Sequence, residues 1–362
     1  MACSAASNTS FRSGLPKRIT TISQAKKMTT SIQALAYHHP SEPPQWHTLP
    51  MPAIAPHDLF IEIEALGVNP IDYKLRHNLK TPKPRPKILG WDAAGTVVAK
   101  GNAVSRFQCG ERVFYAGHLH RDGCYASHQL VDERLVAHAP KQLSAEHCAV
   151  IPLTGITAWE ALFYRLGIRE QEEKQQQLLI IGAGGGVGSM AIQLAKQVAG
   201  LDVTATVSHA KARQWCHQLG ADICLDHEQD LVTQYHDMGL TAPDYILCCA
   251  NTDTYFDTMA TLVASEGAIC ALVDTQQAHD LQTLKAKSAR FVWEFMFTHP
   301  IHSPTSWRHH DILQSLSQLL DSQSIISSWQ QTVGPLSPDA ITQAHAQLIT
   351  THTVGKIALT AR

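Results

Sequence analysis

The sequence predicts an α/β protein in which a doubly wound parallel sheet adjoins a second, β-rich domain. From residue 178 onward, short apolar runs alternate with helical periods, which is typical of a parallel sheet covered by helices on both faces. Residues 32–152 show instead short alternating strands punctuated by Pro and Gly. A chain of 362 residues is long enough to bury the cores of two such domains.

The predicted elements begin with the β-rich half, where residues 59–68 alternate as a strand does. A helical period takes over at 153–168, and a regular series of β–α units follows. The strands of these units are expected at 178–181, 203–207, 223–225, 245–249 and 267–273, with helices between them. We therefore expect these strands to lie parallel in one sheet.

Two more helices and a strand are predicted near the C-terminus. The helices are expected at 309–320 and 337–349, and the second begins with Ser337 at its N-cap and Pro338 at its first position. The closing stretch, residues 355–361, is predicted to be a strand.

The composition argues against nucleic acid and membrane as binding partners. The chain has 29 Lys and Arg against 31 Asp and Glu, a formal net charge of −2, so it lacks the basic surface that nucleic acids require. No apolar run approaches the ~18 residues of a membrane span. The nine cysteines follow no disulfide or zinc spacing. We expect no nucleic acid, no membrane, free thiols and a cytoplasmic location.

Residues 1–30 are expected to lie outside the fold. The first 27 contain five basic residues, no acidic residue and no apolar segment of a secretory signal. A transit peptide and a translation start at Met28 both remain open. We therefore treat this segment as a disordered extension or a mis-assigned start.

A glycine-rich turn connects the first strand of the β–α series to its helix. Gly182, Gly185 and Gly188 follow the pattern G-x-x-G-x-x-G, and Gly186 and Val187 complete the turn. A helix N-terminus offers unpaired N–H groups and a partial positive charge, so a pyrophosphate can dock where no Cβ blocks it. The alternative is a tight strand-to-helix crossing without a ligand. The β–α context favours a Rossmann dinucleotide site.

The second strand of that series predicts which dinucleotide binds. Many NAD enzymes carry an acidic residue about 20 residues after the glycine turn. Here the chain has Ser208, His209, Lys211 and Arg213 instead. These side chains favour the 2′-phosphate of NADP(H), unless Lys211 and Arg213 are solvated residues in the first turn of a helix.

Several stretches together resemble the medium-chain dehydrogenase/reductase superfamily, in its zinc-independent quinone oxidoreductase branch related to zeta-crystallin. The matching stretches are 67–76, 88–97, 109–114, 153–162, 182–188 and 355–359, with 287–297 similar to a subgroup labelled zinc-type alcohol dehydrogenase-like proteins. The resemblance implies a β-rich, GroES-like catalytic domain at 31–153 and 301–362. It places a Rossmann NADP(H)-binding domain at 154–300.

The zinc ligands of the zinc-containing relatives are not present at the matching positions. Asn69 stands where those relatives have a Cys, and Trp91 stands where they have the His of a G-H-E motif. Their four-cysteine lobe is reduced to Cys124 within residues 115–134. A catalytic zinc needs three protein donors, so we expect no zinc and no other metal.

Hydride transfer without a metal favours a conjugated acceptor. A quinone or an α,β-unsaturated carbonyl delocalises the charge that arrives with the hydride, so the protein needs only to position it, exclude water and supply a donor. By resemblance, Tyr73 and Trp91 would form walls of this pocket. A zinc-dependent alcohol dehydrogenase and a non-catalytic, NADPH-binding zeta-crystallin-like protein remain alternatives.

The resemblance also implies three catalytic residues. Asn69 would lie beside the nicotinamide, Lys74 would reach the substrate oxygen as a donor, and Asp72 would orient Lys74. The alternatives are that Asn69 and Pro70 form a simple turn, and that Lys74 is a solvated surface lysine.

Four further residues are expected to contact the cofactor. Thr157 matches a threonine near the nicotinamide ribose, unless its hydroxyl only bonds within its helix. Asn251 and Val273 follow later strands and should border the nicotinamide, because ligands bind outside the carboxyl ends of such sheets. Lys356 is similar to a lysine found near the cofactor, with a plain strand-end charge as the alternative.

The run "FVWEFMF" at 291–297 is too apolar for a strand that faces water. In the superfamily the corresponding strand pairs subunits. We therefore expect a homodimer, and core packing within one chain is the alternative.

Overall fold

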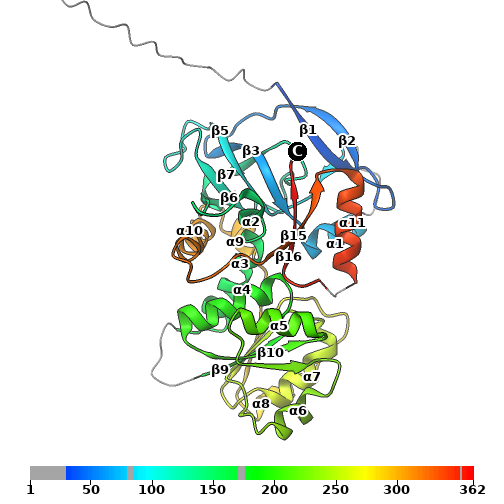
Figure 1. The fold of residues 1–362 in the computed structure, drawn as a ribbon, viewed down its shortest axis with the longest axis vertical. Helices are drawn as coiled ribbons and strands as arrows, with labels where there is room; N and C mark the ends of the chain where they lie inside the picture. The colour runs from blue at the N-terminus through cyan, green and yellow to red at the C-terminus, as the bar shows by residue number, and fades with distance from the viewer. Residues whose placement is uncertain (1–29, 80–84, 170–175, 351–352) are drawn as a thin grey trace, which may run out of the picture.

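The computed structural model describes residues 30–79, 85–169, 176–350 and 353–362. It divides into two stacked halves, each built on its own sheets (Figure 1). The expected extension at 1–30 lies outside the described residues, apart from residue 30.

Six parallel strands form one sheet in the order β11-β10-β9-β12-β13-β14. Counted from β9, this is the order 3-2-1-4-5-6 of doubly wound dinucleotide-binding sheets. The order reverses between β9 and β12, where such sheets bind their ligands. The strands are β9 Gln177–Ile181, β10 Asp202–Val207, β11 Ile223–Asp226, β12 Tyr245–Cys248, β13 Ala268–Ala271 and β14 Arg290–Trp293.

Helices cover both faces of this sheet because its strands are apolar on both sides. In β9, Leu178 and Ile180 pack into one hydrophobic cluster, and Leu179 and Ile181 pack into another. The first cluster includes residues of α4 and α5, and the second includes residues of α6, α7 and α8. These helices are α4 Gly186–Leu194, α5 Ala210–Gln218, α6 Leu231–Asp237, α7 Thr252–Leu262 and α8 Gln282–Lys285.

The other half contains a seven-stranded sheet and a three-stranded sheet. The larger has the order β15-β16-β3-β5-β6-β8, with β7 also paired to β3, and the smaller has the order β2-β1-β4. The first four strands are β1 Ser31–Tyr37, β2 Gln45–Pro50, β3 Asp58–Gly67 and β4 Lys87–Ile88. The others are β5 Ala93–Lys100, β6 Arg112–Tyr115, β7 His128–Asp132, β8 Val136–His138, β15 Trp329–Pro335 and β16 Lys356–Thr360.

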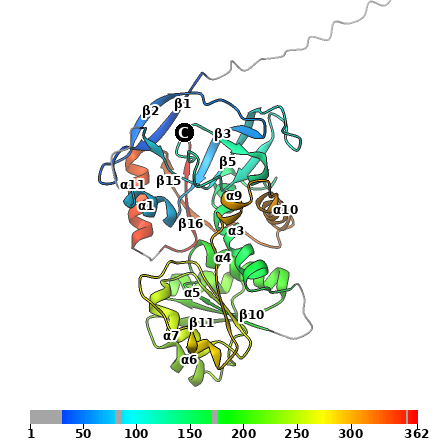
Figure 2. The same ribbon diagram turned by 180° about the vertical axis from the view of Figure 1, so that it is seen from behind.

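The C-terminal strand returns to the β-rich half, where β16 pairs antiparallel with β3 (Figure 2). The helices of this half and of the junction are α1 Pro70–His77, α2 Ala145–Ala149, α3 Pro152–Trp159, α9 Thr298–His302, α10 Arg308–Asp321 and α11 Pro338–Ile349. A 3-10 turn spans Glu133–Leu135, and π-helical turns at Glu160–Arg165 and Ala195–Ala199 extend α3 and α4. The predicted fold class is confirmed.

The run at 291–297 is a strand only in its first part. β14 ends at Trp293, and the next residue, Glu294, turns inward with 4% of its surface exposed. The Arg165 guanidinium lies 2.8 Å from the Glu294 carboxyl group, but burial and the neighbouring Glu160 carboxyl together raise the pKa of Glu294 to about 9. The strand therefore ends within the apolar run, directly before a buried acidic side chain.

None of the helices in the described part of the chain is long and apolar enough to cross a membrane.

Candidate active site

The glycine turn lies between β9 and α4, at the switch point of the parallel sheet. Gly182 has φ +76°, a conformation that favours glycine, and its N–H donates to the Thr206 hydroxyl at 3.0 Å. A Cβ on Gly188 would lie 2.3 Å from the Ala183 carbonyl oxygen. These two glycines are therefore required by the turn itself.

Gly185 differs, because a Cβ added there would meet no atom within 4 Å. It is the N-cap of α4 with φ −80° and ψ −177°, which any residue can adopt. The space beside it lies at a helix N-terminus, the place where a phosphate group docks when the backbone is unobstructed. Gly185 and the first turn of α4 thus fit the pyrophosphate of a dinucleotide.

The same turn contacts the β-rich half. Gly355 donates its N–H to the Gly184 carbonyl at 2.8 Å. A Cβ on Gly186 would lie 2.7 Å from Cδ of Lys356 and 2.8 Å from Cγ2 of Thr154. Lys356 therefore lies at the junction of the two halves, directly against the glycine turn.

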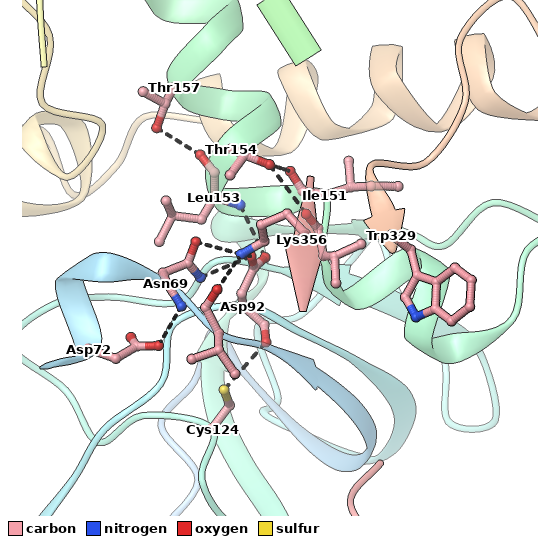
Figure 3. Close-up of polar contacts among 12 residues, drawn as sticks. Asn69, Asp72, Asp92, Cys124, Ile151, Leu153, Thr154, Thr157, Trp329 and Lys356 are labelled. Carbon is pink, nitrogen blue, oxygen red and sulfur yellow. Dashed lines mark hydrogen bonds and ion pairs between the residues drawn. The ribbon is translucent and has the colours of Figure 1, made fainter. Parts of the chain in front are cut away.

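The Lys356 ammonium is the centre of a buried polar network (Figure 3). It donates to the Val68 carbonyl at 2.8 Å and to Asn69 Oδ1 at 2.6 Å, and it lies 3.1 Å from Asp92 Oδ2. Only 3% of the Lys356 surface is exposed. A lysine this deeply buried needs such partners, so Lys356 is more than a strand-end charge.

Asp92 is a member of the network that sequence reasoning missed. It is fully buried, its Oδ2 accepts from Asn69 Nδ2 at 3.1 Å, and its Oδ1 accepts from the Leu153 N–H at 3.1 Å. Burial raises the pKa of Asp92, and the Lys356 ammonium opposes that rise. The available signal was an acidic residue directly after Trp91 in an otherwise apolar stretch.

Asn69 and Asp72 cap the first turn of α1. Asn69 is the N-cap, and its backbone N–H donates to Asp72 Oδ2 at 2.8 Å. The Tyr125 hydroxyl donates to the same oxygen at 2.8 Å. Because that proton is used, we assign His345 Nε2–H, 3.2 Å away, as a donor to the Tyr125 oxygen.

This environment corrects the role expected for Asp72. No hydrogen bond or ion pair among the described residues joins Asp72 to Lys74, whose side chain is exposed on α1. Asp72 is fully buried, and burial raises its pKa to about 7 against the hydrogen bonds that it accepts. The N–H of Asn69 turns Asp72 inward, so Asp72 orients α1 rather than Lys74.

The expected pocket walls differ in exposure. Tyr73 is partly buried, and its ring centroid lies 6.2 Å from that of His345. Trp91 is 1% exposed and donates its indole N–H to the His118 carbonyl at 3.2 Å. Trp91 is thus packed into the core of the β-rich half, whereas Tyr73 retains an accessible edge.

The Thr157 hydroxyl makes a hydrogen bond within its own helix, which was the alternative to a contact with the cofactor. Its hydroxyl donates to the Leu153 carbonyl at 2.7 Å, one turn earlier in α3 (Figure 3). One turn earlier in the same helix, the Thr154 methyl group faces Gly186. The sequence pattern did not single out Thr154, although it lies nearer to the glycine turn.

The residues expected at the adenosine end lie where β10 meets α5. His209 caps α5, and its Nδ1 accepts from the Ala212 N–H at 3.2 Å. Lys211 is exposed beside a polar pocket, and the Arg213 guanidinium donates to the Cys224 carbonyl. Ser208 is partly buried directly after the last residue of β10. Two definite cations therefore flank this end of the sheet.

One carboxylate at this edge was not anticipated. Asp226 is the register partner of Val207 on the neighbouring strand β11. Its Oδ1 accepts from the Glu228 N–H at 3.0 Å, and its Oδ2 accepts from the Gln229 amide at 3.1 Å. The adjacent strand thus supplies an acid that the stretch after β10 lacks, because sheet pairing joins distant residues.

Asn251 and Val273 follow β12 and β13 at the carboxyl edge of the sheet. Asn251 caps α7, and its Oδ1 accepts from the Thr254 N–H at 3.1 Å. The Val273 carbonyl accepts from the Thr252 hydroxyl at 2.5 Å. The two loop ends are therefore tied to each other on the far side of the switch point from Gly182.

No group of three His, Cys, Asp or Glu side chains within the described ranges is arranged to hold a metal ion. At the two positions where zinc ligands were sought, Asn69 bonds to Lys356 and Asp92, and Trp91 bonds to a carbonyl.

Comparison with known families matches both halves. The family model for the alcohol dehydrogenase GroES-like domain matches residues 55–141, and that for zinc-binding dehydrogenases matches residues 186–300. A zinc-type alcohol dehydrogenase-like protein of Staphylococcus aureus is 40% identical over 305 residues, covering 83% of this chain and 90% of that protein. A 2-methylene-furan-3-one reductase of Solanum lycopersicum is 32% identical, covering 61% and 60% of the two chains.

Three solved structures share the whole architecture. A Rhizobium etli protein described as a zinc-dependent alcohol dehydrogenase is 35% identical with a TM-score of 0.87, covering 92% and 98% of the chains. The quinone oxidoreductase of Coxiella burnetii is 25% identical with a TM-score of 0.75, covering 92% and 99%. A mycobacterial protein complexed with NADPH is 25% identical with a TM-score of 0.77, covering 91% and 100%.

Proposed function

The chain belongs to the medium-chain dehydrogenase/reductase superfamily, among its zinc-type alcohol dehydrogenase-like proteins, and is an oxidoreductase. From this premise we propose that it transfers hydride from NADPH, without a zinc ion, to quinones or α,β-unsaturated carbonyl compounds.

The observation that carries the proposal is the Lys356 network. Its ammonium lies 2.6 Å from Asn69 Oδ1, at one of the positions where relatives have a zinc ligand, and 3.1 Å from Asp92 Oδ2, directly after the other such position, Trp91. The Lys356 ammonium already pairs with the Asp92 carboxylate, and Asn69 and Trp91 offer neither a thiolate nor an imidazole, so a Zn²⁺ ion would meet electrostatic repulsion from Lys356 without its preferred ligands at these two positions. These residues therefore favour chemistry that does not depend on a metal.

NADPH would supply the hydride when bound. Gly185 leaves room for its pyrophosphate at the N-terminus of α4. Lys211 and Arg213 would neutralise its 2′-phosphate, because each is a definite cation near the end of β10. The NADPH complex of the mycobacterial neighbour supports this choice of cofactor.

A conjugated acceptor suits the side chains that remain. Asn69 would be held rigidly beside the nicotinamide by Lys356 and Asp92 and would serve as a positioning residue. Lys74 is exposed on α1 and would donate to the developing enolate or hydroquinone oxygen, with Tyr73 beside it. The names of the Coxiella and tomato relatives, a quinone oxidoreductase and a 2-methylene-furan-3-one reductase, support this substrate class.

We also propose a homodimer through β14. This strand is the last in the sheet order and carries Trp293, which is 46% exposed, and Phe295 beyond its end is equally exposed. An open apolar edge of this kind favours pairing with a second copy. A dimer mass in light scattering that becomes a monomer mass in W293E, but not in K285E, would support this proposal. A monomer at micromolar concentration would reject it.

The proposed function can be tested with a panel of substrates and cofactors on a single protein preparation. Oxidation of NADPH and of NADH is followed with 1,4-quinones, enals and enones, and oxidation of primary alcohols is followed with NADP⁺, with metal content measured on the same preparation. NADPH-dependent turnover of quinones or enones without stoichiometric zinc is the expected result. Bound zinc with alcohol oxidation would favour the alcohol dehydrogenase, and tight NADPH binding with no turnover would favour the non-catalytic alternative.

A variant and its matched control test whether Lys74 is the hydrogen-bond donor to the substrate oxygen. Lys74→Ala should lower kcat about 10- to 100-fold with little change in NADPH binding, because a positioned donor acts on the transition state. Lys285→Ala is the control, since Lys285 is also exposed and lies on α8, away from the switch point. Equal rates in both variants would remove Lys74 from the mechanism.

A further inference from the structure

The connection between β6 and β7 contains a buried tyrosine whose hydroxyl group reaches the first turn of α1. Tyr125 is fully buried, and a Cβ added to Gly90 would lie 2.4 Å from Cδ1 of its ring, so the ring occupies space that only a glycine leaves free. The Tyr125 N–H donates to the Leu89 carbonyl at 2.9 Å, and the Tyr125 carbonyl accepts from the Leu35 N–H at 2.7 Å. Ring and backbone are therefore both held in place, and the hydroxyl group with them.

The Tyr125 hydroxyl group connects α11 to α1. It donates to Asp72 Oδ2 at 2.8 Å and lies 3.2 Å from His345 Nε2, which is assigned above as a donor to it. The same Asp72 oxygen accepts from the Asn69 N–H at 2.8 Å (Figure 3). Burial lowers the pKa of His345 to about 4, so the ring is neutral and carries a single N–H. His345, Tyr125, Asp72 and Asn69 thus form one continuous set of hydrogen bonds that joins three separate segments.

The Tyr125 hydroxyl group has no substitute in this set. Within the described ranges, Asp72 Oδ1 and His345 Nδ1 are buried without a hydrogen-bond partner. Without the hydroxyl group, the buried Asp72 carboxyl group would keep only the Asn69 N–H as a donor, and the His345 N–H would lose its acceptor. A buried polar group that loses its partner is destabilised, so Asp72 would no longer be held toward the first turn of α1.

The first turn of α1 carries the residues assigned to the substrate side of the site. Asn69 is its N-cap, and Lys74 follows Asp72 by two positions in the same helix. We infer that Tyr125 and His345 are positioning residues for hydride transfer, which hold Asn69 and Lys74 in place through Asp72. The inference rests on the proposed function. A displacement of about 1 Å in such a group can lower a rate about 100-fold, although neither positioning residue touches a ligand.

The variant Tyr125→Phe tests this role, because it removes only the hydroxyl group. We expect kcat for quinones or enones to fall about 10- to 100-fold, with KM for NADPH within about twofold of the unmodified chain. The cofactor contacts expected at Gly185 and Lys211 lie in the other half, which explains the unchanged KM. Tyr115→Phe is the matched control, since Tyr115 is 1% exposed on β6 and its hydroxyl group has no hydrogen-bond partner among the described residues. Both constants should stay unchanged in this control.

A pair of variants at His345 separates hydrogen bonding from packing. His345→Gln keeps an N–H donor of similar reach, whereas His345→Leu removes the donor. We expect the glutamine variant to retain most of kcat and the leucine variant to resemble Tyr125→Phe. Equal losses of kcat in the two His345 variants would overturn the role of the hydrogen bond. This pair also provides the test if thermal unfolding shows that Tyr125→Phe does not fold.

Hydrogen–deuterium exchange over residues 69–77 gives a readout that needs no substrate. Exchange should be faster in Tyr125→Phe and His345→Leu than in the unmodified chain, and unchanged in Tyr115→Phe. Unchanged exchange in Tyr125→Phe, or faster exchange with an unchanged kcat, would overturn the inference. No turnover by the unmodified chain would refute the proposed function and this role with it, whereas turnover that Tyr125→Phe leaves unchanged refutes the role alone.

Discussion

Replacing Gly185 by Val is the sharpest test of the dinucleotide site, because it separates binding from folding. The backbone at Gly185, with φ −80° and ψ −177°, accepts a β-branched residue, and a Cβ there meets nothing within 4 Å. Valine is a poorer N-cap than glycine, but it also loses less backbone entropy on folding. We expect the free energy of unfolding to change by less than about 1 kcal/mol.

Cofactor binding should respond much more strongly. The new side chain occupies the space through which a pyrophosphate reaches the N–H groups of α4. Each hydrogen bond to a charged group contributes about 1.5–3 kcal/mol, so losing two of them costs about 3–6 kcal/mol. We expect NADPH to bind at least about 100-fold more weakly, since every 1.4 kcal/mol is a factor of ten.

Calorimetric titration with NADPH and thermal unfolding on the same samples provide the readout. Gly188→Ala is the contrasting variant, because its Cβ would lie 2.3 Å from the Ala183 carbonyl oxygen and 2.5 Å from its Cα. That overlap should cost about 1–3 kcal/mol of stability. If Gly185→Val bound NADPH within threefold of the unmodified chain, or unfolded as readily as Gly188→Ala, the assignment of the turn would be wrong.

Three further predictions concern the buried network and cofactor choice. Lys356→Met should cost about 3–5 kcal/mol in urea unfolding, because it leaves the Asp92 carboxylate buried without its cation, and a loss below about 1 kcal/mol would contradict the network. The pKa of Asp72 is raised from 3.8 to about 7, so the folded state favours the protonated carboxyl group. This preference adds about 4 kcal/mol to the free energy of unfolding below pH 3.8, and the gain is lost as the pH rises to 7. Asp72→Asn should therefore flatten the pH dependence of urea unfolding between pH 4 and 7, and an unchanged slope would refute this assignment. Lys211→Glu should raise the KM for NADPH about tenfold or more without changing the KM for NADH, while the control Lys285→Glu should change neither. Equal changes in KM for both cofactors would argue against a phosphate contact at Lys211.

The sequence by itself was sufficient for the fold class and for the place of the glycine turn between β9 and α4. Both depend on local patterns: an apolar run such as β9 is typical of a strand buried on both faces, and closely spaced glycines between a strand and a helix are typical of a tight turn. Even there, the sequence could not distinguish Gly185, which faces open space, from Gly188, which packs against Ala183. The run at 291–297 also did not reveal where β14 ends, because Glu294 is buried beside Arg165, which lies far from it in the sequence.

The tertiary structure alone decided how the site residues are connected. Lys356 meets Asn69 across 287 positions of the chain, and Tyr125 and His345 meet across 220 positions. No periodicity predicts such pairs, since they arise from the return of β16 to β3 and from the packing of α11 beside α1. Asp72 was expected to face Lys74, but the helix cap turns it toward Asn69 and into the core. Residue types follow from the sequence, whereas the direction of each side chain follows from long-range packing, and at this site direction determines which groups can reach a ligand.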